Sequence, residues 1–240
     1  MIWNQYVEVE EKMKEALAAA GRPEGSARLL AVSKTKPLEM IEELAARGVK
    51  AFGENKVQEL CAKQEACRYP DLEWHLIGHL QRNKVRQLLK HKVALIHSVD
   101  SDRLALELEK EAAKLEQTVN ILVEINIGKE ASKTGIFPEE AENLVRKIAS
   151  DCPHLKVQGL MCVAPEMESM DAVRPYFRQM RELRDAIDAL NLPGVCMKEL
   201  SMGMTGDFPA AIEEGATIIR VGTAIFGMRD YGQAANASIQ

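Results

Sequence analysis

ARLLAVSKTKP, residues 27–37, is an apolar run that stops abruptly at a lysine. Residues 29–32 have the aliphatic side chains of a buried strand, and Ser33 and Lys34 follow directly. Pro37 suits the first turn of a helix, because the N–H group that proline lacks has no acceptor there. A buried strand that leads into a helix is the repeating unit of parallel α/β sheets.

The same alternation recurs along the whole chain. Eight short runs rich in Val, Ile and Leu are separated by longer segments with helical spacing, which predicts an α/β protein with a (β/α)8 barrel, a TIM barrel. An open, doubly wound sheet is the alternative, and we prefer the barrel because no G-x-G-x-x-G follows the first strand. The strands are expected at residues 28–34, 50–53, 73–77, 93–98, 119–126, 156–162, 197–201 and 216–221.

The helical segments complete this pattern. The first 20 residues are amphipathic, and we expect them to form an extra N-terminal helix outside the barrel. No linker or low-complexity segment divides the chain, so residues 1–240 are expected to form a single domain. The clearest helices are expected at residues 37–48, 101–116, 138–150 and 170–190.

The composition is that of an ordinary globular protein. Of the 240 residues, 46% are hydrophobic and 28% are charged, which is enough apolar material for a large core. The formal net charge of −5 gives no support to electrostatic binding of nucleic acid. No run of about 18 apolar residues is present, so we expect no membrane span.

Cysteine and histidine spacing predicts neither disulfides nor a metal site. Five cysteines are an odd number, and no two have the spacing C-x-x-C. His75 and His79 stand four apart, but Gly78 and the strand pattern before it argue against a helix that presents both to one metal. The N-terminus lacks the basic and apolar regions of a signal peptide, so a cytoplasmic protein is expected.

Two segments near the end of the chain predict a phosphate site. SMGMTGD follows the seventh strand and RVGTAIFG ends the eighth, and both place glycine beside a hydroxyl residue. Glycine lets the backbone approach an anion closely, and Ser201 and Thr223 can donate hydroxyl hydrogen bonds. The loops after strands seven and eight are a recurrent phosphate site of this fold. Ordinary tight turns are the alternative interpretation.

Lys34 is the candidate reactive amine. If Val32 points into the barrel, alternation along the strand brings Lys34 to the same face at the upper rim. Loss of hydration in a low-dielectric mouth favours the neutral amine, which can attack a carbonyl to form a Schiff base. A solvated lysine at a strand end is the alternative. Lys36 lies beyond the strand, and we expect it to reach solvent.

A reactive lysine and a phosphate site on one face suit a ligand that carries both a carbonyl group and a phosphate. Pyridoxal 5′-phosphate has both groups, and so does a phosphosugar in an aldolase. Arg220 ends the eighth strand and stays protonated, so opposite a pyridine nitrogen it would keep that nitrogen unprotonated. Contact with the phosphate is the other role open to Arg220.

Six segments, in order along nearly the whole chain, resemble the pyridoxal phosphate homeostasis proteins (the YggS/PROSC family). They are LLAVSKTKP, FGENKVQEL, EWHLIGHLQRNK, GLM, LSMGMTGDFPAAI and RVGTAIFG. The resemblance implies that Lys34 carries pyridoxal 5′-phosphate covalently, as an internal aldimine. Lys56 stands where many relatives have an aromatic residue. The other cofactor-binding residues that the resemblance implies are Asn55, Ser201, Gly203, Arg220, Gly222 and Thr223.

The barrel is also similar to the N-terminal domain of alanine racemase, and of eukaryotic ornithine decarboxylase. Those enzymes add a β-domain that supplies a second catalytic group across a dimer, and the sequence ends at residue 240, 20 residues after Arg220. The resemblance therefore implies a monomeric carrier without catalytic residues, which maintains vitamin B6 and amino-acid pools. Amino acids and apoenzymes that depend on pyridoxal phosphate are the expected exchange partners. The alternative is a fold-type III racemase or decarboxylase.

Overall fold

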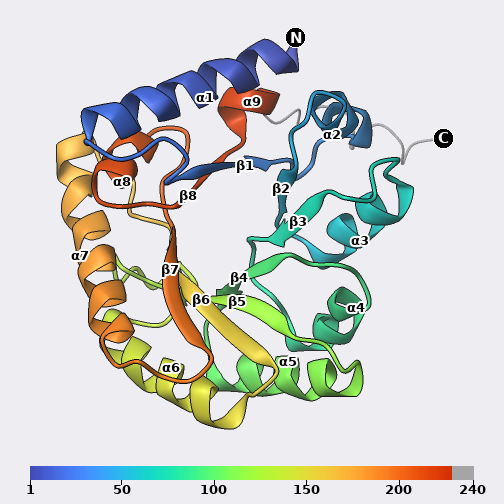
Figure 1. Cartoon of the computed structure of the whole chain (residues 1–240), viewed down its shortest axis with the longest axis vertical. Helices are drawn as coiled ribbons and strands as arrows, with labels where there is room; N and C mark the ends of the chain where they lie inside the picture. The colour runs from blue at the N-terminus through green and yellow to red at the C-terminus, as the bar shows by residue number, and fades with distance from the viewer. Residues whose placement is uncertain (229–240) are drawn as a thin grey trace.

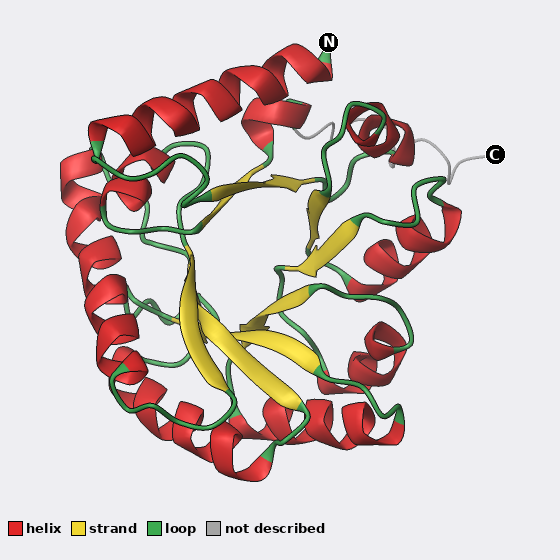
Figure 2. Cartoon of the chain, in the orientation of Figure 1, coloured by secondary structure: helices red, strands yellow, loops and turns green. Residues whose placement is uncertain are grey.

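The strands of the computed structural model, which describes residues 1–228, close into one barrel (Figures 1 and 2). All pairs are parallel and follow chain order, and β8 pairs back with β1. Closure leaves no strand edge unpaired, which confirms the predicted (β/α)8 barrel. The strands are β1 (Arg28–Val32), β2 (Ala51–Glu54), β3 (Glu73–Leu76), β4 (Leu95–Val99), β5 (Val119–Ile125), β6 (Leu155–Cys162), β7 (Val195–Ser201) and β8 (Ile218–Val221).

Helices surround the strands on the outside of the barrel (Figure 2). Serine caps begin two of them: the Ser101 side chain accepts the Leu104 N–H at α5, and Ser169 accepts the Ala172 N–H at α7. The helices are α1 (Ile2–Ala19), α2 (Leu38–Ala45), α3 (Val57–Ala66), α4 (Val85–Leu89), α5 (Asp102–Lys114), α6 (Pro138–Asp151), α7 (Met170–Asp188), α8 (Phe208–Glu213) and α9 (Thr223–Phe226), with a short 3-10 helix at Arg82–Lys84.

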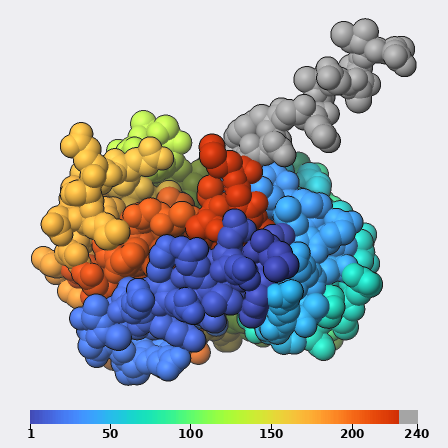
Figure 3. Space-filling model, turned by 90° about the horizontal axis from the view of Figure 1, so that it is seen from above, coloured from blue at the N-terminus to red at the C-terminus, as the bar shows by residue number. Residues whose placement is uncertain are grey.

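The extra N-terminal helix is confirmed. Tyr6, Val9, Met13 and Leu17 recur at helical spacing and are buried, which gives α1 one apolar face. This face packs on α8 and α9, so α1 lies across the late helices at the outside of the barrel (Figures 1 and 3). In the described chain, residues 1–228, no helix is both long and apolar enough to cross a membrane.

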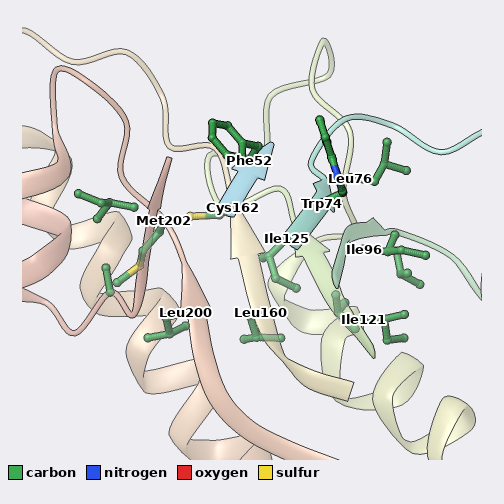
Figure 4. Packing of buried hydrophobic residues seen from close by; sticks show 14 of the residues in the cluster. Phe52, Trp74, Leu76, Ile96, Ile121, Ile125, Leu160, Cys162, Leu200 and Met202 are labelled. Carbon is green, nitrogen blue, oxygen red and sulfur yellow. The ribbon is translucent and has the colours of Figure 1, made fainter. Parts of the chain in front are cut away.

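The core has two layers, because side chains alternate along each strand. The larger layer lies between the strands and the helices, and Figure 4 shows members of it from β2 to β7. The smaller layer comprises Leu30, Leu95, Leu122, Met161 and Ile218. Buried polar side chains stand beside these residues, since Leu30 pairs in register with Arg220 and Met161 with Ser201.

Two boundary predictions are corrected by the structure. β1 ends at Val32 rather than at residue 34, so the argument from strand alternation stops before Lys34. Residues 33–36 form a turn in which the Lys36 N–H donates to the Ser33 carbonyl at 3.0 Å. β7 begins at Val195, two residues before the predicted start at residue 197.

Candidate functional site

The predicted site residues lie at the carboxyl ends of their strands. These ends meet at one mouth, because all eight strands are parallel. β1 pairs with both β2 and β8, which brings the first and last of the predicted segments side by side. The residues are Lys34 after β1, Asn55 after β2, Ser201 and Gly203 at and after the end of β7, Arg220 in β8, and Gly222 and Thr223 after β8.

Arg220 places a cation inside the barrel. Its side chain is 5% exposed and donates from Nη1 to Ser201 Oγ and from Nη2 to the Cys162 carbonyl oxygen, both at 2.7 Å. Within residues 1–228, no carboxylate lies within ion-pair distance of it. Burial lowers the pKa of Arg220 from its usual value. A buried cation without a paired carboxylate is unfavourable, so this guanidinium suits a ligand that accepts hydrogen bonds.

A chain of hydrogen bonds fixes the direction of this guanidinium. His97 Nδ1 lies 2.9 Å from Ser201 Oγ, and His97 Nε2 lies 2.9 Å from His75 Nδ1. Arginine only donates, so the Ser201 hydroxyl accepts from Arg220, and we assign its own proton to His97 Nδ1. The network then assigns the proton of each imidazole to Nε2. Burial lowers the pKa of both histidines, which keeps them in the neutral form that the chain requires.

Sequence reasoning missed this chain. His97 stands at an inward position of an otherwise apolar strand, and a histidine in such a strand was the only available signal. Ser201 takes part in this chain, and its predicted contact with a phosphate stays a prediction. His79, the other half of the rejected zinc pair, is half-exposed and lies 3.3 Å from Asp100. Among residues 1–228, no three His, Cys, Asp or Glu side chains could hold a metal ion together.

The glycine turns after β7 and β8 are required by backbone packing. Gly203 has φ +92°, and a Cβ there would lie 2.7 Å from Ala211 Cβ. A Cβ on Gly222 would lie 3.0 Å from the Val32 carbonyl oxygen, so the β8 turn approaches the end of β1 closely. Thr223 begins α9 and is exposed at the mouth, where its hydroxyl and the first N–H groups of the helix can face a ligand.

A cavity of about 590 Å³ adjoins the turn after β7. It lies between the β6–α7 loop and the β7–α8 turn, and Met167, Met204 and Asp207 are among its lining residues. None of the seven predicted residues lines it in the part of the chain that the structure describes. This cavity is therefore distinct from the predicted site at the carboxyl ends of the strands.

A buried hydrogen bond between Ser33 and Glu54 holds the turn that carries Lys34. Lys34 is half-buried, whereas Ser33 is fully buried and its hydroxyl donates to Glu54 Oε1 at 2.6 Å. Burial raises the pKa of Glu54 to about 7, although Lys63 and Ser33 both act to lower it. Lys36, which was expected to reach solvent, donates to the Met228 carbonyl oxygen at 2.9 Å.

Asn55 follows this buried carboxyl at the mouth. Gly78, at the end of β3, packs directly against its backbone, since a Cβ on Gly78 would lie 2.4 Å from the Asn55 carbonyl oxygen. Asn55 is half-buried, so its amide lies at the boundary between the barrel wall and the mouth.

The sequence matches known proteins along most of its length. The family model of the alanine racemase N-terminal domain matches residues 8–230. The pyridoxal phosphate homeostasis protein of Aquifex aeolicus is 48% identical over 223 residues, which cover 93% of this chain and 96% of the relative. The protein of the same name from Pseudomonas aeruginosa is 40% identical over 228 residues, which cover 95% and 96% of the two chains.

Solved structures share the fold. An unknown protein from Bifidobacterium adolescentis has a TM-score of 0.86 at 38% identity, with 94% of each chain covered. PipY of Synechococcus elongatus, solved with pyridoxal phosphate bound, has a TM-score of 0.77 at 37% identity and covers 90% of this chain and 100% of its own. An alanine racemase from Clostridium difficile has a TM-score of 0.72 at 14% identity, with 56% of its chain covered, which shows the fold alone.

The first prediction concerns the chain that orients Arg220. Ser201→Ala leaves Nη1 of Arg220 without its acceptor and Nδ1 of His97 without its donor, so we expect a loss of about 2–3 kcal/mol in the free energy of unfolding. Ser98→Ala is the matched control, because Ser98 is also fully buried but its hydroxyl has no partner among residues 1–228. Urea denaturation measures both. Equal losses in the two variants would contradict the assigned chain.

The second prediction concerns pH. Folded Glu54 keeps its proton up to about pH 7, whereas the unfolded chain releases it near the ordinary value of 4.5. Between these values the folded state binds more protons, so stability falls as pH rises through this window. Relative to Glu54→Gln, the wild type should lose on the order of 2 kcal/mol across it. A difference between the two proteins that stays constant with pH would show that Glu54 titrates normally.

Proposed function

The chain belongs to the family of the pyridoxal phosphate homeostasis proteins, and on that premise we propose that it carries pyridoxal 5′-phosphate (PLP) at the barrel mouth. It binds this cofactor and maintains the cellular pool of it. The related PipY has PLP bound in its solved structure, and it matches this chain over nearly the whole length. The observation that carries the proposal for the site is the convergence of Lys34, Arg220 and two glycine turns on one mouth.

Lys34 is the residue that we assign to the cofactor aldehyde. It lies in the turn directly after β1, half-buried at the mouth, where a primary amine can reach a bound carbonyl. When bound, PLP supplies an aldehyde carbon and an electron-withdrawing ring. The amine of Lys34 would hold the aldehyde carbon, and an incoming amine would take the place of Lys34 on that carbon when the cofactor is handed over.

Arg220 and the glycine turns are the residues that we assign to the rest of the cofactor. The guanidinium is held at the level where β6 and β7 end, by the Cys162 carbonyl and the Ser201 hydroxyl. The turns at Gly203 and Gly222 lie just beyond the strand ends, where backbone N–H groups can face a phosphate. We therefore assign the ring nitrogen to Arg220 and the phosphate to the turns and Thr223. This set of residues fits PLP, since Lys34 supplies an amine for the aldehyde, Arg220 a donor for the ring nitrogen, and the turns donors for the phosphate.

We infer that the protein is a carrier rather than an enzyme. Arginine stays protonated, so Arg220 donates to the ring nitrogen and leaves it without a proton. An unprotonated ring is a weak electron sink and gives little help to carbanion chemistry. The names of the relatives agree with a role in homeostasis.

The proposal extends to the cellular location of the protein and to the molecules that receive PLP from it. All five cysteines are unpaired thiols in the structure, which suits the reducing cytoplasm. We propose that the chain acts there as a monomer. Amino acids and PLP-dependent apoenzymes are the proposed recipients of the cofactor.

The third prediction tests Lys34. The wild type mixed with PLP should show a visible absorbance band from the Schiff base, and Lys34→Ala should abolish it, because this substitution removes the amine that we assign to the aldehyde. Lys36→Ala is the control and should keep the band, since Lys36 is directed to the Met228 carbonyl. A band that persists in Lys34→Ala would place the cofactor on another lysine. A colourless wild type would favour the aldolase alternative.

The fourth prediction tests the absence of turnover. Purified protein loaded with PLP is incubated with L-alanine or D-alanine, and circular dichroism follows the optical activity of the solution. We expect no change beyond that caused by free PLP, because racemisation needs acid–base groups on both faces of the substrate. Sustained racemisation that Lys34→Ala removes would make the protein an enzyme of the alanine racemase type.

A further inference from the structure

We propose that Lys63 is a positioning residue, which fixes the turn that presents Lys34 at the barrel mouth. Lys63 lies on α3, in the layer between the barrel wall and the helices, and was not among the residues that the sequence indicated. This inference rests on the proposed function of Lys34 as the residue that holds PLP. The contacts of Lys63 are all with other protein groups, so they can be tested without the cofactor.

Lys63 is a buried charge with a complete set of acceptors. Only 9% of the residue is exposed. Its Nζ donates to the Ser33 carbonyl oxygen at 2.8 Å, to Glu54 Oε1 at 2.7 Å and to Glu59 Oε1 at 2.8 Å. An ammonium group has three N–H donors, so each of these acceptors receives one. Such a group is costly to bury and keeps its place only while all three contacts hold.

These contacts reach both peptide groups of Lys34. The Ser33 carbonyl belongs to the peptide bond before Lys34, and it accepts from Lys63 directly. The Thr35 N–H belongs to the peptide bond after Lys34, and it donates to Glu59 Oε1 at 2.6 Å. The same carboxylate oxygen accepts from Lys63. Lys63 therefore holds one side of Lys34 directly and the other side through Glu59.

The turn needs this support because it contains an unfavourable backbone conformation. Thr35 has φ 63°, in the left-handed region that β-branched residues rarely adopt. A non-glycine residue there costs on the order of 1–3 kcal/mol and persists only where its surroundings hold it. The bond from the Thr35 N–H to Glu59 supplies that hold. Without it, the residues beside Lys34 can relax to ordinary conformations and move the amine.

The Ser33 hydroxyl ties the same network to the barrel wall. It donates to Glu54 Oε1, the oxygen that also accepts from Lys63. Glu54 ends β2, and Ser33 follows the last residue of β1, so the network joins two strands to α3. This arrangement holds the Lys34 turn in place with or without a ligand.

The test uses the full-length protein with three variants. Lys63→Met removes the ammonium group. Glu59→Ala removes the Thr35 acceptor from a partly exposed site, and so serves if Lys63→Met does not fold. Lys63→Arg restores the charge and the donors. Arg22→Met is the matched control, because the Arg22 guanidinium also binds backbone carbonyls, those of Ile212, Ala216 and Ser26, but at the opposite end of β1.

Amide hydrogen exchange of residues 33–36 is measured first, in protein without cofactor. Lys63→Met loses three charge-assisted hydrogen bonds and Glu59→Ala loses two, so exchange should be at least about tenfold faster in both variants. Arg22→Met should lower the melting temperature and leave the exchange of this segment unchanged. Lys63→Arg should restore most of the protection.

Release of PLP from loaded protein to a trapping amine is measured second. It should accelerate about tenfold in the same two variants and not in Arg22→Met. Exchange and release within about twofold of the wild type in Lys63→Met or Glu59→Ala would overturn the proposal. Equal effects in Arg22→Met would also overturn it. Because hydrogen exchange needs no cofactor, its result stays separate from any failure of Lys34 to bind PLP.

Discussion

The pairing of β8 with β1 is the contact on which the site depends. In its register Leu30 lies opposite Arg220, so the strand that leads to Lys34 runs beside the strand that carries the buried guanidinium. These segments are far apart in the sequence, and only closure of the barrel brings them together. An open sheet with the same strands would leave Lys34 and Arg220 at opposite edges, with no common mouth between them.

The closed barrel then has to accommodate polar groups in its interior. Arg220 is tolerated there because Ser201 and the Cys162 carbonyl accept its hydrogen bonds, and because neutral His97 and His75 continue the chain without adding charge. A second buried network, around Lys63, lies on the other side of the strands and supports the turn of Lys34. The interior network orients the cation, and the outer network holds the amine. Both are built from residues that do not need to contact the ligand.

Much of the fold was accessible from the sequence, because hydrophobic periodicity reports strands and helices directly. All eight strands were placed within a few residues, and the glycine turns after β7 and β8 were placed correctly. The networks were not accessible, since their partners are distant in the chain: His97 and Ser201 are 104 positions apart, and Lys63 lies 30 after Ser33. The end of β1 was misplaced because threonine gives no sign of the left-handed conformation that Thr35 adopts.

The proposed function depends on one covalent bond, between the side chain of Lys34 and the aldehyde of PLP. Reduction of the loaded protein with borohydride makes such a bond permanent, and mass spectrometry of the digested chain then locates the pyridoxyl group. We predict a single modified peptide, the one that contains Lys34. A pyridoxyl group on a different lysine, or an unmodified chain after reduction of protein that had bound the cofactor, would contradict the account.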